Sequence, residues 1–350
     1  MANRYWRGGS GTWNSSNTGN WSTTSGGSGG ASVPTASDNA IFDSNSGSPT
    51  VTISGTVNCF TWTVSAYAFF NDSGATVNVY GGITWSSGSG QTMSATINWK
   101  ATGSAGFTAS AANTWGTLVV DGVGGECALL STFKANTISL VNGTFTTNNY
   151  SVNAVSFSSN TNSGSSNIRT INMGSSTITL SGSGTVWNVN DSFGTYTQNR
   201  GTSTLSLTSA SAKTVYAPGY NFYNVVQAGA GTLTYTAGGT INNMTVTALP
   251  TTIKLQSYGP FTFTTFGLSG ASGNQLTLTS TSAGSPVGIQ LASGSGTVSV
   301  SYTTLQDIDA STYGSGTTWL AYTSNGNVDN GGNTGWVFQA PNTGNFMGFF

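Results

Sequence analysis

Residues 115–140, WGTLVVDGVGGECALLSTFKANTISL, open a stretch in which short apolar-x-apolar pairs recur among Ser, Thr, Asn and Gly as far as Ile308. One apolar anchor can be taken from each occurrence: Leu118, Ile138, Val155, Ile178, Leu205, Val225, Met244, Phe266, Ile289 and Leu305. Successive anchors lie about 21 residues apart, a period typical of solenoids and repeat arrays. The period predicts a fold and an architectural role, but it does not name a ligand or a reaction.

The composition narrows the class of protein. Charged residues make up 5% of the 350-residue chain, and apolar residues make up 36%. Enough apolar side chains are present to fill a core, whereas disordered chains combine low hydrophobicity with high charge or few aromatic residues. Glu and Lys are scarce, and β-branched residues, Ser, Asn and Gly occupy every window in place of better helix formers. We therefore expect an all-β chain.

Two all-β architectures fit the turns: a parallel β-helix or solenoid, and antiparallel β-sandwich or barrel domains. Asn224 and Asn243 lie 19 residues apart, each beside an apolar residue of the periodic pattern. Like residues at equal positions of stacked coils form ladders, so this spacing favours the parallel β-helix. Each coil of about 20 residues is expected to hold two or three short strands and their turns.

The chain is expected to have four parts: an aromatic, Gly/Ser-rich N-terminal head or cap (1–48), a β-helical repeat domain (49–310), a C-terminal cap (311–338) and a hydrophobic docking tail (339–350). A solenoid leaves apolar core and strand edges exposed at its end rungs, so a terminal cap is physically required.

Aromatic and apolar residues gather at both ends of the chain. We interpret the head as a hydrophobic cap, with a binding platform as the alternative, and we expect the tail to dock into a neighbouring subunit or a partner. The expected interaction residues are Tyr5, Trp6, Trp13, Trp21, Phe346, Met347, Phe349 and Phe350.

Charge, cysteine count and hydropathy exclude several partners. The net charge is −1, and the eight basic residues are too scattered to form the stripe that a phosphate backbone requires, so no nucleic-acid partner is expected. Cys59 and Cys127 have no metal-site spacing, and packed free thiols are favoured over a bridge. No apolar run approaches the roughly 18 residues of a membrane span, and the N-terminal segment lacks a signal peptide's apolar region. No membrane association is expected, and the chain is expected to be made in a cytoplasm without export.

Three parts of the chain carry a resemblance. They are YWRGGSGTWNSSNTGNWSTTSGGSGGASVPTASDNAIFD, the weakly repeated rungs, and SYTTLQDIDAS with SNGNVDNGGNTGWVF. Together they resemble β-helical structural and adhesion proteins of bacteriophages and bacterial surfaces, especially virion fibre, spike or shell-associated proteins. The resemblance implies a virion protein, often trimeric, that assembles with itself and with other virion structural proteins. The alternative that it implies is a tail spike or fibre that binds or cleaves a host-surface glycan.

The absence of histidine removes the usual general base and the common nucleophile triads. Carboxylates remain, and glycoside hydrolysis needs two of them roughly 5 to 10 Å apart. Asp307 and Asp309 have the i,i+2 spacing that would place both on one face of a strand about 7 Å apart. Asp is also a routine turn residue, so we favour a structural role for this pair and expect no enzyme. Asp121 and Glu126 form a weaker second pair.

No metal or other cofactor is expected. Asn325, Asn327 and Asp329 alternate as oxygen ligands do in a calcium loop. Asn330 stands where that loop needs Gly, and Trp336 stands where it needs a bidentate Glu. An Asn/Gly turn is therefore the favoured interpretation.

Aromatic rings beside Asn and Thr side chains could stack on sugars, although most aromatic residues of a solenoid fill its corners. The candidate contact residues for a glycan are Trp187, Tyr196, Tyr216, Tyr220 and Tyr223.

Overall fold

The structure is a computed structural model, and it describes residues 1–87, 90–159, 167–190, 194–236, 239–256, 260–311 and 316–339. The described residues include β-strands, most of them short, and two 3-10 helices, η1 (Ser44–Ser46) and η2 (Thr323–Asn325). The predicted all-β class is confirmed. The chain divides into two compact units, Met1–Ser206 and Leu207–Phe350. The head expected at residues 1–48 belongs to the same unit as the coils that follow it.

Short strands make up the first unit. They are β1 (Ala2–Trp6), β2 (Gly11–Trp13), β3 (Trp21–Ser22), β4 (Asp38–Phe42), β5 (Thr50–Ile53), β6 (Thr56–Cys59), β7 (Trp62–Val64), β8 (Phe69–Asn71), β9 (Thr76–Val79), β10 (Ile83–Trp85), β11 (Thr96–Trp99), β12 (Ser104–Thr108), β13 (Trp115–Leu129), β14 (Phe133–Thr146), β15 (Val152–Ser159), β16 (Ile168–Asn172), β17 (Thr177–Leu180), β18 (Gly184–Val189) and β19 (Thr195–Asn199). Strand β20 (Thr204–Leu207) crosses the boundary between the units in the chain.

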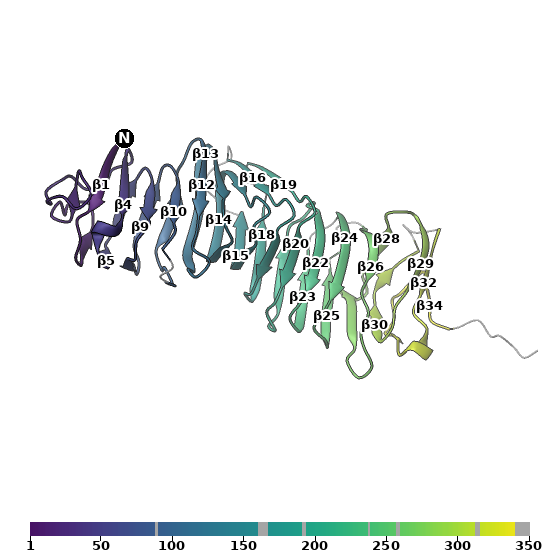
Figure 1. The fold of residues 1–350 in the computed structure, drawn as a ribbon. Helices are drawn as coiled ribbons and strands as arrows, with labels where there is room; N and C mark the ends of the chain where they lie inside the picture. The colour runs from purple at the N-terminus through teal and green to yellow at the C-terminus, as the bar shows by residue number, and fades with distance from the viewer. Residues whose placement is uncertain are drawn as a thin grey trace, which may run out of the picture. The chain divides into compact units, whose positions relative to one another are not determined.

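The first coils of this unit visit three series of strands in turn, and each series pairs in parallel. The series are β1–β4–β7–β10–β12, β2–β5–β8 and β6–β9–β11–β13. Figure 1 shows the strands of this unit following one another in chain order, from purple to teal. Among the strand pairs described here, β1–β3 is antiparallel. This large, mostly parallel arrangement is consistent with a β-helix or solenoid, and it differs from the antiparallel sandwich or barrel.

The register shows why the sequence has a period near 20 residues. Val57 aligns with Val77, Val77 with Ile97, and Ile97 with Leu118, and all four side chains are buried in one inward column. The predicted anchor Leu118 then aligns with Ile138, as expected. Alternation along each strand places these side chains inward and their Thr and Asn neighbours outward.

Some of the predicted anchors do not align with one another in the register of paired strands. Ile138 aligns with Phe157, and the expected anchor Val155 lies 43% exposed just before it. The spacing predicted this residue wrongly, because Val155 lies within β15 with its side chain outward, between the buried residues Ala154 and Phe157. In the second unit, Ile289 aligns with Phe261 and Leu305 with Leu278, so these two anchors belong to different columns.

Aromatic side chains fill the interior of the first unit. Trp13 packs against Trp21 and Trp62 with ring centroids 5.4 and 5.7 Å apart, and Trp62 packs against Trp85 at 5.4 Å. The series continues from Trp85 to Trp115 at 5.3 Å. Edge-to-face packing of this kind adds to the stabilisation from burial alone. The tryptophans of the head are therefore the first members of an interior aromatic column.

Both cysteines are buried and free, as the sequence predicted. Burial raises the pKa of each thiol, and in Cys127 the neighbouring Glu126 carboxylate raises it further. The thiols therefore stay protonated and pack as small apolar groups.

The second unit also consists of mostly parallel strands. They are β21 (Lys213–Tyr216), β22 (Phe222–Gln227), β23 (Gly231–Tyr235), β24 (Gly239–Val246), β25 (Thr251–Leu255), β26 (Phe261–Gly267), β27 (Leu276–Ser280), β28 (Val287–Leu291), β29 (Ser295–Ser299), β30 (Thr303–Gln306), β31 (Ile308–Asp309), β32 (Gly316–Leu320), β33 (Val328–Asp329) and β34 (Trp336–Val337). Asn224 on β22 aligns with Asn243 on β24, which confirms the equivalence predicted from their spacing.

The last strands of the second unit carry an aromatic cluster. Strands β29, β32 and β34 form a three-stranded parallel sheet. The buried Trp319 lies 5.2 Å from Trp336 and 5.3 Å from Phe266 between ring centroids. This packing supports the expectation of an aromatic cap in residues 311–338. The docking tail expected at 339–350, with Phe346, Met347, Phe349 and Phe350, lies outside the described residues apart from Gln339.

The inward column gives a direct test of rung stacking. Ile97 is fully buried and Ile168 is 67% exposed, so the same truncation to alanine should act very differently at the two sites. We expect Ile97→Ala to lower the free energy of unfolding of the first unit by about 2–5 kcal/mol, because the cavity would lie between neighbouring rungs. Ile168→Ala should change it by less than about 0.5 kcal/mol. Urea denaturation followed by tryptophan fluorescence measures both, and equal losses would contradict the assigned register.

Candidate functional site

The N-terminal end of the first unit covers its strand series unequally. Strand β1 begins one series, and its outer edge is covered by β3 through the antiparallel pairs Tyr5↔Ser22 and Trp6↔Trp21. A second series begins with β2, which covers β5. The third series begins with β6, and no described strand pairs with the outer edge of β6. Among the described strands, two first strands, β2 and β6, therefore have no strand partner at their outer edges. On β2 the carbonyl of Thr12 accepts a hydrogen bond from the side-chain amide of Asn17 at 3.0 Å.

Two peptide groups of β6 point outward from the sheet. The carbonyl oxygens of Gly55 and Cys59 accept hydrogen bonds from the amides of Thr76 and Tyr80 at 2.9 and 3.1 Å, so the odd-numbered groups face β9. Peptide groups point alternately to the two edges of a parallel strand. The N–H and C=O groups of Thr56 and Asn58 therefore point away from β9. Their backbone N–H and C=O groups have no hydrogen-bond partner among the residues that the structure describes. The next outward group, the amide of Phe60, donates to the carbonyl of Asp38 at 2.6 Å and ends the open row.

A cavity of about 350 Å³ lies against this edge. We call the segment Val33–Ala36 the roof loop, and it lines the cavity together with Thr56 and Asn58. The roof loop cannot complete the sheet at Pro34, which has no backbone N–H to donate. The full lining is Asn14, Ser15, Val33, Pro34, Thr35, Ala36, Thr56, Val57, Asn58 and Tyr80. None of these side chains is charged at neutral pH.

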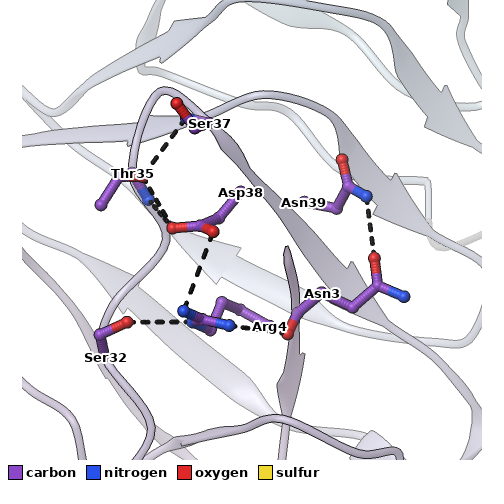
Figure 2. Close-up of polar contacts among 7 residues, drawn as sticks. All are labelled: Asn3, Arg4, Ser32, Thr35, Ser37, Asp38 and Asn39. Carbon is purple, nitrogen blue, oxygen red and sulfur yellow. Dashed lines mark hydrogen bonds and ion pairs between the residues drawn. The ribbon is translucent and has the colours of Figure 1, made fainter. Parts of the chain in front are cut away.

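A polar cluster holds the roof loop in place (Figure 2). The Asp38 carboxylate accepts hydrogen bonds from the Thr35 amide at 3.1 Å and from the Thr35 hydroxyl at 2.7 Å. Its other oxygen lies 3.8 Å from an Arg4 guanidinium nitrogen, and the Nε of Arg4 donates to the Ser32 hydroxyl at 3.0 Å. Strand β4 is thus tied to Thr35 of the roof loop, and strand β1 is tied to Ser32, the residue that precedes the loop.

The hydrogen bonds and the positive charge of this cluster change the pKa of Asp38. Burial of the carboxyl would raise its pKa, but the hydrogen bonds from the Thr35 hydroxyl and amide and the positive charge of Arg4 outweigh burial. The pKa of Asp38 is therefore lowered from its usual value. The carboxylate form is favoured in the folded chain because the donors around it stabilise negative charge.

An amide ladder on the outer face ends at the cavity. The side-chain amide of Asn98 donates to the side-chain oxygen of Asn78 at 3.0 Å, and that of Asn78 donates to Asn58 at 2.9 Å. The same polarity leaves the Nδ2 donor of Asn58 at the end of the ladder, where it makes no hydrogen bond to a described residue. The Tyr80 hydroxyl, which also lines the cavity, likewise has no described partner.

The predicted interaction residues of the head are mostly core. Trp6, Trp13 and Trp21 are fully buried, whereas Tyr5 is half-buried. The cap interpretation fits this burial. A platform that presents these three indole rings to a partner does not, because each ring already packs against others within the unit.

The expected pairing of Asp307 and Asp309 on one strand face was wrong. Asp307 lies between β30 and β31 with φ of 55°, and it is buried, with its carboxylate accepting a hydrogen bond from the Gly284 amide at 3.0 Å. The Asp309 carboxylate accepts from the amide and hydroxyl of Ser311 and from the Thr334 hydroxyl. The left-handed backbone at Asp307 breaks the strand between them, so the i,i+2 argument does not apply.

Asp121 and Glu126 also have structural partners. The Asp121 carboxylate contacts the ammonium of Lys100 at 2.5 Å and accepts from the Asn142 amide at 2.7 Å, which links three successive coils. The Glu126 carboxylate accepts from the hydroxyls of Ser104 and Thr146 at 2.6 and 2.5 Å. Each carboxylate thus bonds to side chains of the coils before and after its own.

The three candidate calcium ligands do not share a site. Asn327 is buried, its oxygen accepts from the Thr303 amide at 2.9 Å, and its amide donates to the carbonyls of Val300 and Tyr322. Asp329 accepts from the Gly331 amide and the Asn333 side chain, while Asn325 lies in η2. Within the described residues no group of three or more His, Cys, Asp or Glu side chains could hold a metal ion.

The candidate glycan contacts fall into two groups. Trp187 is fully buried and stacks on Phe157 at 4.3 Å between ring centroids, and Tyr196 is buried beside the Arg169 guanidinium. These two rings belong to the core of the first unit, so the expectation of surface contacts was wrong for them. In the second unit Tyr216, Tyr220 and Tyr223 are half-buried, and they stay candidates.

Sequence reasoning missed the cavity at β6. A signal was present, because the triplets at Thr56–Asn58, Thr76–Asn78 and Thr96–Asn98 read TVN, TVN and TIN at intervals of 20 residues. This repeat marks the outer ladder of Thr and Asn. It does not show which coil comes first in the series, and that position decides where the open edge lies.

Comparison with known proteins gives no family for this chain. No protein-family model, curated protein or solved structure matches it. In the part of the chain that the structure describes, no helix has the length and apolarity needed to cross a lipid bilayer.

The anchoring cluster predicts a pH-dependent contribution to stability. Because the folded-state pKa of Asp38 is lowered, its stabilisation is fully present above the unfolded-state pKa of about 4 and is lost as the pH falls through the folded-state value. We expect Asp38→Asn to lower the free energy of unfolding by about 1 kcal/mol at pH 7. The difference from the unsubstituted chain should shrink below about pH 4, in parallel urea titrations. A difference that stays constant or grows in acid would contradict the assigned role of the carboxylate.

Proposed function

We propose that this chain is a non-enzymatic structural component of a phage particle, built as a closed parallel β-helix. It assembles with copies of itself, most simply as a trimer, and with other virion proteins. The observation that carries the proposal is the use of the candidate catalytic carboxylates. All four accept hydrogen bonds from the backbone or from neighbouring rungs, as Asp307 does from Gly284 and Glu126 does from Thr146. Carboxylates that are used to hold the coils together favour a structural role for the protein over a catalytic one.

Support for a closed coil comes from the order of the strands. Strands β5, β6 and β7 are followed by β8, β9 and β10, which pair in parallel with the first three in the same order. A chain that returns to each of three strand series once per coil encloses an interior, and the buried tryptophan column occupies it.

Support for a role outside the cell comes from the outer surface. The net charge is −1, and the outer columns of the first coils carry Thr and Asn. Contacts between such surfaces depend little on ionic strength, because few charges are available to be screened. Localisation in the virion, with synthesis in the host cytoplasm, is part of this proposal, and so are the other virion proteins as partners.

Host-glycan binding is the second candidate function, and one groove favours it. A cavity of about 300 Å³ in the first unit is lined by Lys134, Asn153 and Thr179, which lie in register on the paired strands β14, β15 and β17. Its amide, hydroxyl and ammonium groups can bind sugar hydroxyls. No aromatic ring lines this groove, so it lacks the stacking surface that strengthens glycan recognition. We therefore rank the structural role first.

Immunogold electron microscopy tests the structural role. Antibody raised against residues 1–206 would be applied to purified particles from the phage culture that produces this protein. We expect label at one defined position on every intact particle, because an assembled component is present in fixed copy number. Particles without label, with all of the protein in the soluble fraction, would contradict the proposal.

A carboxylate test separates structure from hydrolysis. We expect purified particles to release no reducing ends from host polysaccharide, and particles that carry Asp307→Asn with Asp309→Asn to adsorb to host cells as the unsubstituted particles do. The reason is that both carboxylates are occupied by turn hydrogen bonds. Release of reducing ends that falls at least tenfold in the double variant would show that the pair is catalytic. Adsorption of particles carrying Lys134→Ala tests the glycan groove in the same assay.

A further inference from the structure

We infer that the outer edge of β6 is a docking edge for an uncharged, extended segment of a partner protein. The inference rests on the proposed function, since a structural component needs contacts with other chains, and it specifies one contact and its chemistry. The segment would occupy the cavity between β6 and the roof loop.

The backbone of β6 determines the class of ligand. The N–H and C=O groups of Thr56 and Asn58 point away from β9, two residues apart, and have no partner among the described residues. A row of alternating donors and acceptors at this spacing matches the backbone of another extended chain, which is how β-augmentation gives affinity. A sugar could bind some of these groups, but its hydroxyls do not repeat at the spacing of a strand. The edge therefore favours a peptide.

The amide ladder determines the register of the segment. Thr56 and Asn58 head the outer columns that continue as Thr76 and Asn78 on β9. A segment with the pattern Thr-x-Asn would extend both columns by one rung, and its Asn oxygen would accept from the Nδ2 donor of Asn58, as Asn58 accepts from Asn78. Such amide ladders stabilise stacked strands when every member is paired.

The cavity wall determines the charge of the segment. Val33, Pro34 and Tyr80 line the cavity, and no charged side chain of a described residue does. A Lys, Arg, Asp or Glu side chain would lose hydration there without gaining an opposite charge. The segment is therefore uncharged over the residues that enter.

The roof loop limits the length of the contact. Arg4 and Asp38 tie it to the first strands, and the Phe60 amide is already bonded to the Asp38 carbonyl. Only the peptide groups of Thr56 and Asn58 are open in this row of the described chain, so the paired part of the segment is short.

Fluorescence anisotropy with the full chain tests the inference. The probe is a fluorescein-labelled peptide, Gly-Thr-Val-Asn-Val-Gly with a C-terminal amide, whose central residues copy Thr76–Val79. We expect saturable binding. The same peptide with N-methyl groups on its backbone amides should bind at least tenfold more weakly, because N-methylation removes the donors that pair with β6 while keeping the side chains. Absence of binding, or equal binding by the N-methyl peptide, would overturn the inference.

Two substitutions place the binding at this edge. Asn58→Asp keeps an oxygen for Asn78 and replaces the free donor by an acceptor, so it should weaken binding at least tenfold while leaving the fold intact. Asn330→Asp, at an exposed position of the second unit, is the matched control and should not change the affinity. Tyr80→Ala removes part of the cavity wall and should also weaken binding, which guards against a folding defect peculiar to one variant. Affinities unchanged by both Asn58→Asp and Tyr80→Ala would overturn the inference.

The outcomes of this experiment and of particle labelling are distinguishable. Peptide that fails to bind, with gold label present on every particle, would remove the β6 contact and leave the structural role standing. Peptide that binds to a protein absent from particles would keep the docking edge and remove the virion assignment.

Discussion

Parallel pairing of each strand with the strand one coil earlier is the interaction on which the first unit depends. This pairing satisfies the backbone groups of short strands that could not be stable singly, and it brings like residues into columns. The column from Val57 through Val77 and Ile97 to Leu118 is the inward result. The Asn58–Asn78–Asn98 ladder is the outward one. Both columns follow from one register.

Pairing between coils also creates a problem at the first coil, where each strand series has one edge without an earlier partner. The chain covers the edge of β1 with the antiparallel strand β3, and on β2 the Asn17 side chain donates to the Thr12 carbonyl. Trp6, Trp13 and Trp21 fill the interior of these first coils. Over β6 it places only the roof loop, which includes Pro34 and leaves a cavity. A covering loop without pairing protects an edge from nonspecific association and keeps its hydrogen-bonding groups available. The proposed docking edge follows from this difference in covering.

Much of the fold could be predicted from the sequence because the coil period is imposed by the strands themselves. The all-β class, the coil length and the equivalence of Asn224 and Asn243 depend on local alternation and spacing, and these were predicted correctly. Val155 was wrong as an anchor because spacing alone does not distinguish a residue whose side chain points inward from one whose side chain points outward on the same strand. The division into two units was not predicted, since the apolar pattern runs through residues 206 and 207 without a break.

The site was less predictable than the fold. Asp307 adopts a left-handed backbone that its type permits but does not require, and Trp187 gives no sign in sequence of which way its ring points.

Hydrogen exchange of backbone amides in the free chain tests the stacking of coils, because stacking predicts different exchange rates for amides on the two edges of β6 and on β9. The amides of Thr76 and Tyr80 donate to the carbonyls of Gly55 and Cys59, whereas those of Thr56 and Asn58 face the cavity. Residue-resolved exchange should therefore show strong protection at Thr76 and Tyr80 and rapid exchange at Thr56 and Asn58. Equal protection of all four amides would contradict the assigned stacking and the open edge of β6.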